Sequence, residues 1–189
     1  MNTVDLPDDF YDRIHSRLYR RIGREVALAY RVLDLGCGSC ELARFLRQTY
    51  RQRVTGVDIS DGQLPRRDDP SSSRAPLRCI KANASRLGFL RDASVDALVT
   101  TWALHEMAEP EETLREAFRV LRPGGEMLIV DFPKGSLAQR LWNEKYWTAF
   151  EVATLLKETD FVRARARTIY QGQVIWAVGF RPPKTGRKT

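Results

Sequence analysis

The sequence predicts an α/β domain built on a doubly wound, mostly parallel sheet, and three observations predict it. Short apolar segments alternate with longer segments of helical periodicity, which is typical of a parallel sheet covered by helices on both faces. A glycine turn follows the first apolar segment, residues 31–35, and an acidic residue, Asp58, lies at the end of the second. The 189 residues are enough for one domain with a full hydrophobic core.

The first half of the chain follows this alternation up to residue 59. Residues 8–29 have helical spacing, with Ile14, Leu18 and Ile22 on one face. The predicted elements that come next are a strand at 31–35, a turn at 36–39, a helix at 40–50 and a strand at 53–59. The segment 60–78 breaks the pattern, because its three prolines and its serine run predict a loop where the alternation requires a helix.

The second half returns to the alternation and ends in a hairpin. Its predicted elements are strands at 79–82, 95–101 and 126–132, helices at 110–121 and 149–157, and hairpin strands at 162–170 and 173–180. Pro110 opens the first of these helices and the segment 123–125, Pro-Gly-Gly, ends it. Thr148 and Glu151 form a capping box at the start of the second. A ligand of such a sheet is expected at the carboxyl ends of the strands, where the strand order reverses.

The composition indicates an ordinary globular protein. Hydrophobic residues make up 43% of the chain and charged residues 29%, and no apolar run is long enough to span a bilayer. The first ten residues lack the apolar core of an export signal, and three cysteines are an odd number, so we expect a protein of the reducing cytoplasm. We divide the chain into an N-terminal helical lid at 1–30, a main domain at 31–180 and a basic tail at 181–189.

The net charge of +7 has two interpretations. It is consistent with a nucleic-acid partner, but it also arises from arginines scattered along the whole chain together with the basic tail. Because charge alone argues for solubility and weak nonspecific binding, we favour the second interpretation.

The stretch "RVLDLGCGSC", residues 31–40, contains two overlapping motifs. Gly36 and Gly38 form the kind of strand-to-helix turn that lets a backbone approach a nucleotide closely. Cys37 and Cys40 form a C-x-x-C pair, which occurs in zinc sites and in redox proteins. Asp58 decides in favour of the first motif, because a carboxylate about 20 residues after such a turn accepts hydrogen bonds from ribose hydroxyls.

Acidic residues around the turn indicate which nucleoside binds. A dinucleotide site has a third glycine, whereas position 41 is Glu, whose carboxylate would repel a pyrophosphate. Asp34 adds a second acid two residues before Gly36. These acids suit a ligand with an ammonium group and no phosphate.

The chain resembles the class I S-adenosylmethionine-dependent methyltransferases, in particular the small domain found in quinone-biosynthesis C-methyltransferases. The resemblance covers residues 31–180 and lies in the segments "VLDLGCGSC", "VTGVDIS", "ANASRLGF", "VDALVTTWALHEM", "VLRPGGEMLIVDF" and "WTAFEVATLLKETDF". It implies a Rossmann-like sheet of seven strands with the last strand antiparallel, and S-adenosylmethionine as cofactor.

The resemblance also implies roles for individual residues. The cofactor-binding residues that it implies are Asp34, Gly36, Cys37 and Gly38 at the methionine part, Asp58 at the ribose, Ile59, Asn83 and Ala84 at the adenine, and Thr101 beside the methyl group. The sequence departs from the family pattern at Cys40, which replaces a frequent third glycine, and at Asn83, which replaces a common Asp.

Three candidate catalytic residues are Trp102, His105 and Tyr11. Trp102 can place an aromatic face near a sulfonium, His105 can accept a proton near neutral pH, and Tyr11, with His15, can close over the site. Each has an alternative as a packing residue. We expect no metal site, because only Cys79, His15 and His105 remain as zinc ligands beside the C-x-x-C pair, and they lie far apart in the sequence.

The predicted function is transfer of a methyl group from S-adenosylmethionine to a small molecule. The alternatives are an RNA or protein methyltransferase and a noncatalytic module that binds the cofactor. The sequence names neither the acceptor nor the methylated atom, and it leaves the use of a general base, the role of the loop at 61–78 and the oligomeric state open.

Overall fold

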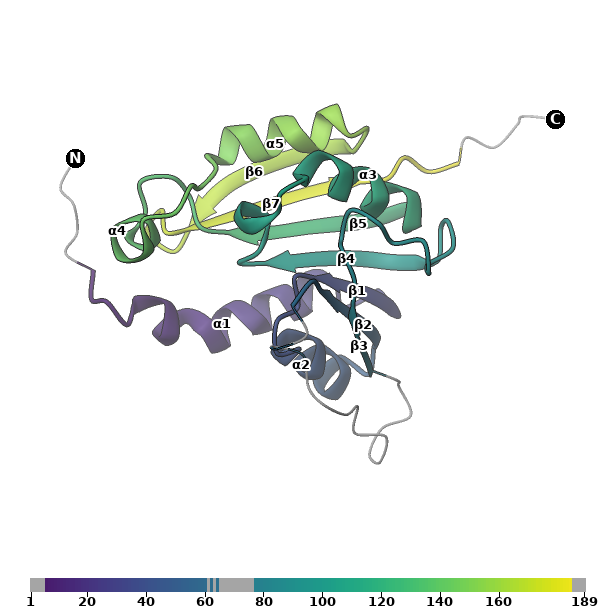
Figure 1. Cartoon of the computed structure of the whole chain (residues 1–189), viewed down its shortest axis with the longest axis horizontal. Helices are drawn as coiled ribbons and strands as arrows, with labels where there is room; N and C mark the ends of the chain where they lie inside the picture. Colours follow the sequence, from purple (N-terminus) through teal and green to yellow (C-terminus); the bar gives the residue numbers. More distant parts are fainter. Residues whose placement is uncertain (1–5, 61, 63, 65–76, 185–189) are drawn as a thin grey trace.

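One seven-stranded sheet organises the chain, as the sequence predicts. The computed structural model describes residues 6–60, 62, 64 and 77–184 (Figure 1). The strands are β1 (Arg31–Leu35), β2 (Arg53–Asp58), β3 (Leu77–Lys81), β4 (Val95–Thr101), β5 (Leu121–Asp131), β6 (Val162–Ile169) and β7 (Val174–Phe180). They lie in the order β3-β2-β1-β4-β5-β7-β6, and β7 runs antiparallel to both of its neighbours.

Helices cover both faces of the sheet. The helices are α1 (Phe10–Glu25), α2 (Glu41–Tyr50), α3 (Pro110–Val120), α4 (Leu137–Trp142) and α5 (Ala149–Glu158), with a short 3-10 helix η1 (Leu104–Glu106). Helices α1 and α2 pack in one core cluster with alternate strand residues such as Val32 and Leu128, and α3 and α5 pack in a second with Leu33 and Met127. Figure 1 shows these two pairs of helices on opposite sides of the strands. None of the helices in the described ranges has the length and hydrophobicity that crossing a membrane requires.

Local sequence signals account for the starts of α3 and α5. The capping box at α5 is formed as predicted, with the Thr148 side chain accepting the Glu151 N–H and the Glu151 carboxylate accepting the Thr148 N–H. Pro110 occupies the first turn of α3. The strand predicted at 126–132 in fact begins at Leu121, because the chain turns extended directly at the end of α3 and stays in the sheet through Gly124, which has a φ of +75°. The loop predicted at 60–78 lies largely outside the described residues, but its last two residues belong to the sheet, because β3 begins at Leu77.

The strand order reverses between β1 and β4. Strands β2 and β3 lie on one side of β1, whereas β4, β5, β7 and β6 lie on the other. The backbones that leave β1 and β4 therefore diverge to opposite faces, and the carboxyl ends of these strands form the edge where ligands of doubly wound sheets bind.

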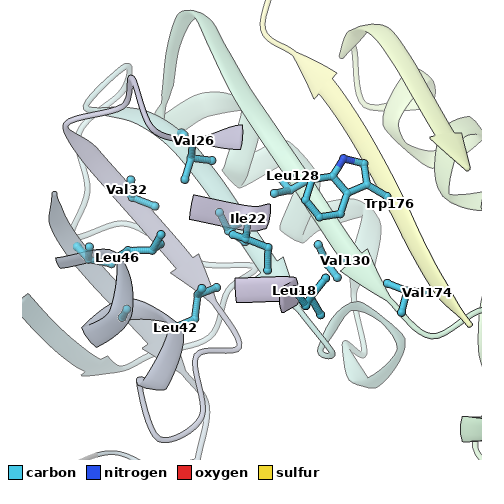
Figure 2. Packing of buried hydrophobic residues seen from close by; sticks show 14 of the residues in the cluster. Leu18, Ile22, Val26, Val32, Leu42, Leu46, Leu128, Val130, Val174 and Trp176 are labelled. Atoms are coloured by element: carbon cyan, nitrogen blue, oxygen red, sulfur yellow. The ribbon is translucent and has the colours of Figure 1, made fainter. Parts of the chain in front are cut away.

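Helix α1 packs against the sheet over its whole apolar face. Leu18 and Ile22 are fully buried, and Figure 2 shows them beside Val130 and Trp176 on the neighbouring strands. This contact makes the helix part of the main core. The division into a lid at 1–30 and a separate main domain stays a prediction.

Truncation of Leu18 tests that contact. We expect Leu18→Ala to lower the free energy of unfolding by about 2–5 kcal/mol, because the side chain is completely buried and leaves a cavity. The neighbouring Arg17→Ala removes an exposed side chain and should change the free energy of unfolding by no more than about 0.5 kcal/mol. Urea unfolding followed by circular dichroism and by tryptophan fluorescence measures both. A Leu18→Ala effect as small as that of Arg17→Ala would show that α1 is not part of the cooperative core.

Candidate functional site

A cavity of about 450 Å³ opens at the carboxyl ends of β1, β2, β3 and β4. Most of the residues that the sequence analysis selected line it. Those residues are Gly36, Cys37, Gly38, Asp58, Ile59, Asn83, Ala84, Thr101 and Trp102. Asp34, Tyr11 and His105 are not among the residues that line the cavity, and Asp34 is buried in β1, two residues before the turn. The structure thus brings segments from four strands together at the predicted edge.

The turn after β1 is held in place by hydrogen bonds of its backbone N–H groups. The N–H groups of Gly36 and Cys37 both donate to the Val57 carbonyl, at 2.8 and 3.1 Å. The Gly38 N–H donates to the Asp58 carboxylate at 2.8 Å. Gly36 has a φ of +69°, and a side chain there would overlap the Cβ of Ala103 across the turn, so only glycine fits.

Asp34 is a buried carboxyl group with an unsatisfied oxygen. It is 2% exposed at the end of β1, and its Oδ2 has no hydrogen-bond partner among the described residues. Burial raises its pKa to about 7, and the negative charge of Asp58 adds to the shift. A buried acceptor of this kind is costly unless a ligand supplies a donor.

Asp58 and Asn83 use part of their hydrogen-bonding capacity within the protein. The two carboxylate oxygens of Asp58 accept the N–H groups of Gly38 and Ser60, at 2.8 and 2.9 Å. The Asn83 amide oxygen accepts the Ser85 N–H at 3.0 Å, which leaves its NH₂ group and one lone pair for a ligand. Ile59 is 68% exposed beside them and offers an apolar surface to a ring.

Of the two cysteines of the turn, Cys37 is a free thiol as expected, whereas Cys40 is not. Cys40 precedes α2 with a φ of 59°, which explains how it replaces a glycine, but it forms a disulfide with Cys79 on β3. The sequence analysis expected reduced cysteines, because their number is odd and the protein was assigned to a reducing cytoplasm, so the disulfide corrects that expectation. Cys37 is a free thiol, with its sulfur 3.3 Å from that of Cys40. Burial raises the Cys37 pKa far above its usual range, and the charges of Asp34 and Asp58 raise it further.

Aromatic side chains close the far end of the cavity. Trp102 lies in its wall and stacks on Phe132 with ring centroids 4.0 Å apart. Tyr11 contacts Phe132 edge to face and stacks on Trp142, while its hydroxyl oxygen accepts the Ala138 N–H at 3.0 Å. Tyr11 therefore connects α1 to α4 instead of pointing into the cavity.

Both ring nitrogens of His105 lie close to carboxylates, outside the cavity lining. Its side chain is 4% exposed, with Nδ1 2.7 Å from Asp131 and Nε2 3.1 Å from Glu144. Burial lowers the pKa of His105, but the hydrogen bond that the ring donates to Asp131 and the charges of Asp131, Glu106 and Glu144 outweigh it, so that the pKa is raised overall. The adjacent Glu106 does line the cavity.

Several lining residues were not selected as site residues from the sequence. Among them are four with side chains large enough to contact a ligand, Tyr19, Glu106, Met107 and Glu109. Glu106 and Met107 could have been found, since they follow β4 closely, where ligand contacts are expected. Tyr19 could not, because nothing in the sequence specifies where α1 lies on the sheet. His15, the second lid candidate, lies against Tyr19 with ring centroids 4.1 Å apart.

Comparisons with known proteins agree with this geometry. Residues 33–129 match the model of the methyltransferase domain family. The chain is 34% identical over 126 residues to an "uncharacterized methyltransferase" of Mycobacterium tuberculosis, covering 67% of this chain and 62% of the relative. It is 31% identical over 157 residues to the mitochondrial 2-methoxy-6-polyprenyl-1,4-benzoquinol methylase of Caenorhabditis elegans, covering 79% and 52%.

Solved structures show the same fold. An S-adenosylmethionine-dependent methyltransferase of Archaeoglobus fulgidus superposes with a TM-score of 0.72 at 14% identity, over 91% of this chain and 98% of that one. The curated relatives are longer, and the matched region spans about half to three fifths of their length.

Thiol counting tests the cysteine arrangement. We expect iodoacetamide at pH 8 to modify the folded protein very slowly, because the raised pKa of Cys37 leaves little thiolate. In urea without a reductant, one thiol per chain should react, and in urea with a reductant all three should react. Mass spectrometry counts the adducts. Three adducts before reduction would contradict the disulfide, and fast modification of the folded protein would contradict the burial of Cys37.

Proposed function

The chain belongs to the methyltransferase domain family, and from this premise we propose that it transfers a methyl group from S-adenosylmethionine to a small-molecule acceptor. The observation that carries the proposal is that a glycine turn, residues 36–38, and the acid Asp58 line one cavity. The buried carboxyl group of Asp34, with its unsatisfied oxygen, lies two residues before the turn.

Each part of the cofactor has a matching group in the cavity or directly beside it. The unsatisfied oxygen of Asp34 can accept the ammonium of the methionine part, which supplies the missing donor. Asp58 can accept the ribose hydroxyls. Asn83 and the exposed face of Ile59 suit the polar edge and the flat face of adenine. No pyrophosphate is needed, in keeping with the acids around the turn.

The transfer itself needs mainly alignment. The sulfonium is a good leaving group, and holding nucleophile, methyl and sulfur in line can supply roughly 7–11 kcal/mol. Trp102 lies in the cavity wall where its ring can attract the sulfonium, by about 1–2 kcal/mol in a dry site. Thr101 lies beside it. Tyr11 acts from outside the cavity, by holding α1 against α4 over this end.

The acceptor is proposed to be small because the aromatic end is closed by packed side chains. Phe132 and Tyr146 are buried, and α4 and Tyr11 cover them. One of the relatives is named for a benzoquinol substrate, which supports an acceptor with a planar ring.

The nucleic-acid alternative has one observation in its favour. Four arginines of α1, Arg17, Arg20, Arg21 and Arg24, line a second hollow together with Glu25 and Tyr170. This hollow shares no lining residue with the cofactor cavity. An anion held there would not by itself reach the reacting methyl, so the small-molecule function is preferred.

Cofactor binding tests the proposed function directly. Isothermal titration calorimetry should detect S-adenosylmethionine or S-adenosylhomocysteine, and no NAD. Asp58→Ala should weaken binding by tenfold or more, because a hydrogen bond to a charged acceptor is worth about 1.5–3 kcal/mol. Asp58→Asn retains an acceptor oxygen and should lose less cofactor affinity than Asp58→Ala.

Two controls accompany this measurement. Circular dichroism establishes that the Asp58 variants fold, because Asp58 also holds the Gly38 N–H. Asp92→Ala, at an exposed position away from the cavity, should bind like the wild type. Binding of NAD without the sulfonium ligand would overturn the assignment, and wild-type affinity in Asp58→Ala would remove Asp58 from the ribose role.

A proton should leave Asp34 when the cofactor binds. In the free protein its pKa of about 7 keeps it mostly protonated at pH 6, whereas pairing with an ammonium favours the carboxylate. Affinity should therefore rise between pH 5.5 and 7 and level off above. Calorimetry in buffers of different ionisation enthalpy should give nearly one proton released per cofactor at pH 6. Asp34→Asn should bind weakly and without this release. Equal affinity at pH 5.5 and 7.5 in the wild type would contradict the assignment.

A further inference from the structure

We propose that His105, Glu106 and Glu144 form a binding site for one divalent transition-metal cation of the zinc type, beside the cofactor cavity. The three side chains come from η1 and from the segment after α4. The sequence analysis expected no metal site, because it counted thiols and imidazoles and left carboxylates out.

The ligand atoms have the spacing that a metal needs. His105 Nε2 lies 3.1 Å from the Glu144 carboxylate and 3.8 Å from the Glu106 carboxylate, and all three atoms lie within 4.8 Å of one another. In a tetrahedral site with bonds of about 2.0–2.1 Å, ligand atoms are separated by about 3.4 Å. Both glutamates are substantially exposed, at 48% and 68%, so small side-chain rotations suffice to close the shell.

Asp131 provides the support that metal-binding histidines usually have. Its carboxylate is fully buried and lies 2.7 Å from His105 Nδ1, while it also accepts the backbone N–H groups of His105 and Phe132. Because Asp131 accepts from Nδ1, a ring that gives up one proton to a metal keeps the Nδ1 proton, and its Nε2 lone pair then faces the two glutamates. A carboxylate behind a histidine in this way orients the ring and makes it a stronger ligand.

The charges of the cluster are unbalanced without a cation. Three carboxyl groups surround one imidazole, and within the described ranges the ion pairs of Glu106, Glu144 and Asp131 all involve His105. Even a protonated imidazole would neutralise only one carboxylate. A divalent cation between Nε2 and the glutamates would neutralise two and would turn the repulsion between them into shared coordination.

The donor set indicates the kind of cation. One imidazole nitrogen with two carboxylates suits Zn²⁺, Mn²⁺ or Co²⁺, whereas Mg²⁺ and Ca²⁺ prefer oxygen ligands alone. Glu106 also lines the cofactor cavity, so an open coordination position would face it. If the proposed function holds, this position would select acceptors that offer an oxygen ligand.

Zinc titration of the whole chain tests the site. The protein is first dialysed against a chelator, and the chelator is then removed by further dialysis. Calorimetry then measures the binding of ZnCl₂ and, in a separate titration, of MgCl₂. We expect one Zn²⁺ per chain and much weaker Mg²⁺ binding. Glu144→Gln and His105→Gln should each lower zinc affinity by tenfold or more. Glu158→Gln changes an exposed carboxylate at the end of α5, and Cys37→Ser removes the free thiol. Both should bind zinc like the wild type.

Each other result overturns the proposal. Absence of zinc binding in the wild type would show that the cluster binds protons and no metal. Full affinity in Glu144→Gln, or loss of binding in Cys37→Ser, would place the metal elsewhere. If His105→Gln does not fold, Glu144→Gln decides alone, since its side chain is half exposed. The titration needs neither cofactor nor acceptor, so its outcome is independent of the proposed methyl transfer.

Discussion

The hydrogen bond between the Gly38 N–H and the Asp58 carboxylate is the interaction on which the cavity depends. It connects the turn after β1 to the end of β2, and the two N–H groups that the Val57 carbonyl accepts hold the same two segments together. Because a charged acceptor makes each such bond stronger than a neutral one, the turn is fixed before any ligand arrives. The buried Asp34 lies just before this turn, and α2 begins just after it at Glu41.

The two ends of the site differ in how much of them could be predicted from the sequence. Gly36, Asp58 and Asn83 were found because each lies at the end of a strand or within two residues of it, and the carboxyl ends of parallel strands meet at one edge. Alternation and capping signals likewise gave the fold, down to the box at Thr148. The partners of His105 were missed because Glu144 follows a short helix, α4, that has no signal of its own in the sequence.

This difference has a physical cause. The proposed cofactor end is built of backbone whose conformation is set within a few residues, and local patterns report it. The far end is built of side chains from α1, η1 and α4, which meet only after the whole sheet has formed. Tyr11 illustrates this, because its contacts with Ala138 and Trp142 join residues more than a hundred positions apart. The identity of an acceptor depends on such contacts, which is why neither the family nor the strand pattern specifies it.

The disulfide between Cys40 and Cys79 closes a covalent ring that includes the whole of α2 and β2. By loop-closure entropy a ring of this size stabilises the folded chain by about 4 kcal/mol, which the glutathione of a reducing cytoplasm would remove. The ring also changes what a protease can do. A single cut at any peptide bond between the two cysteines would open the ring without releasing a fragment, and the nicked protein would keep its original mass, increased by one water, until the sulfurs were reduced.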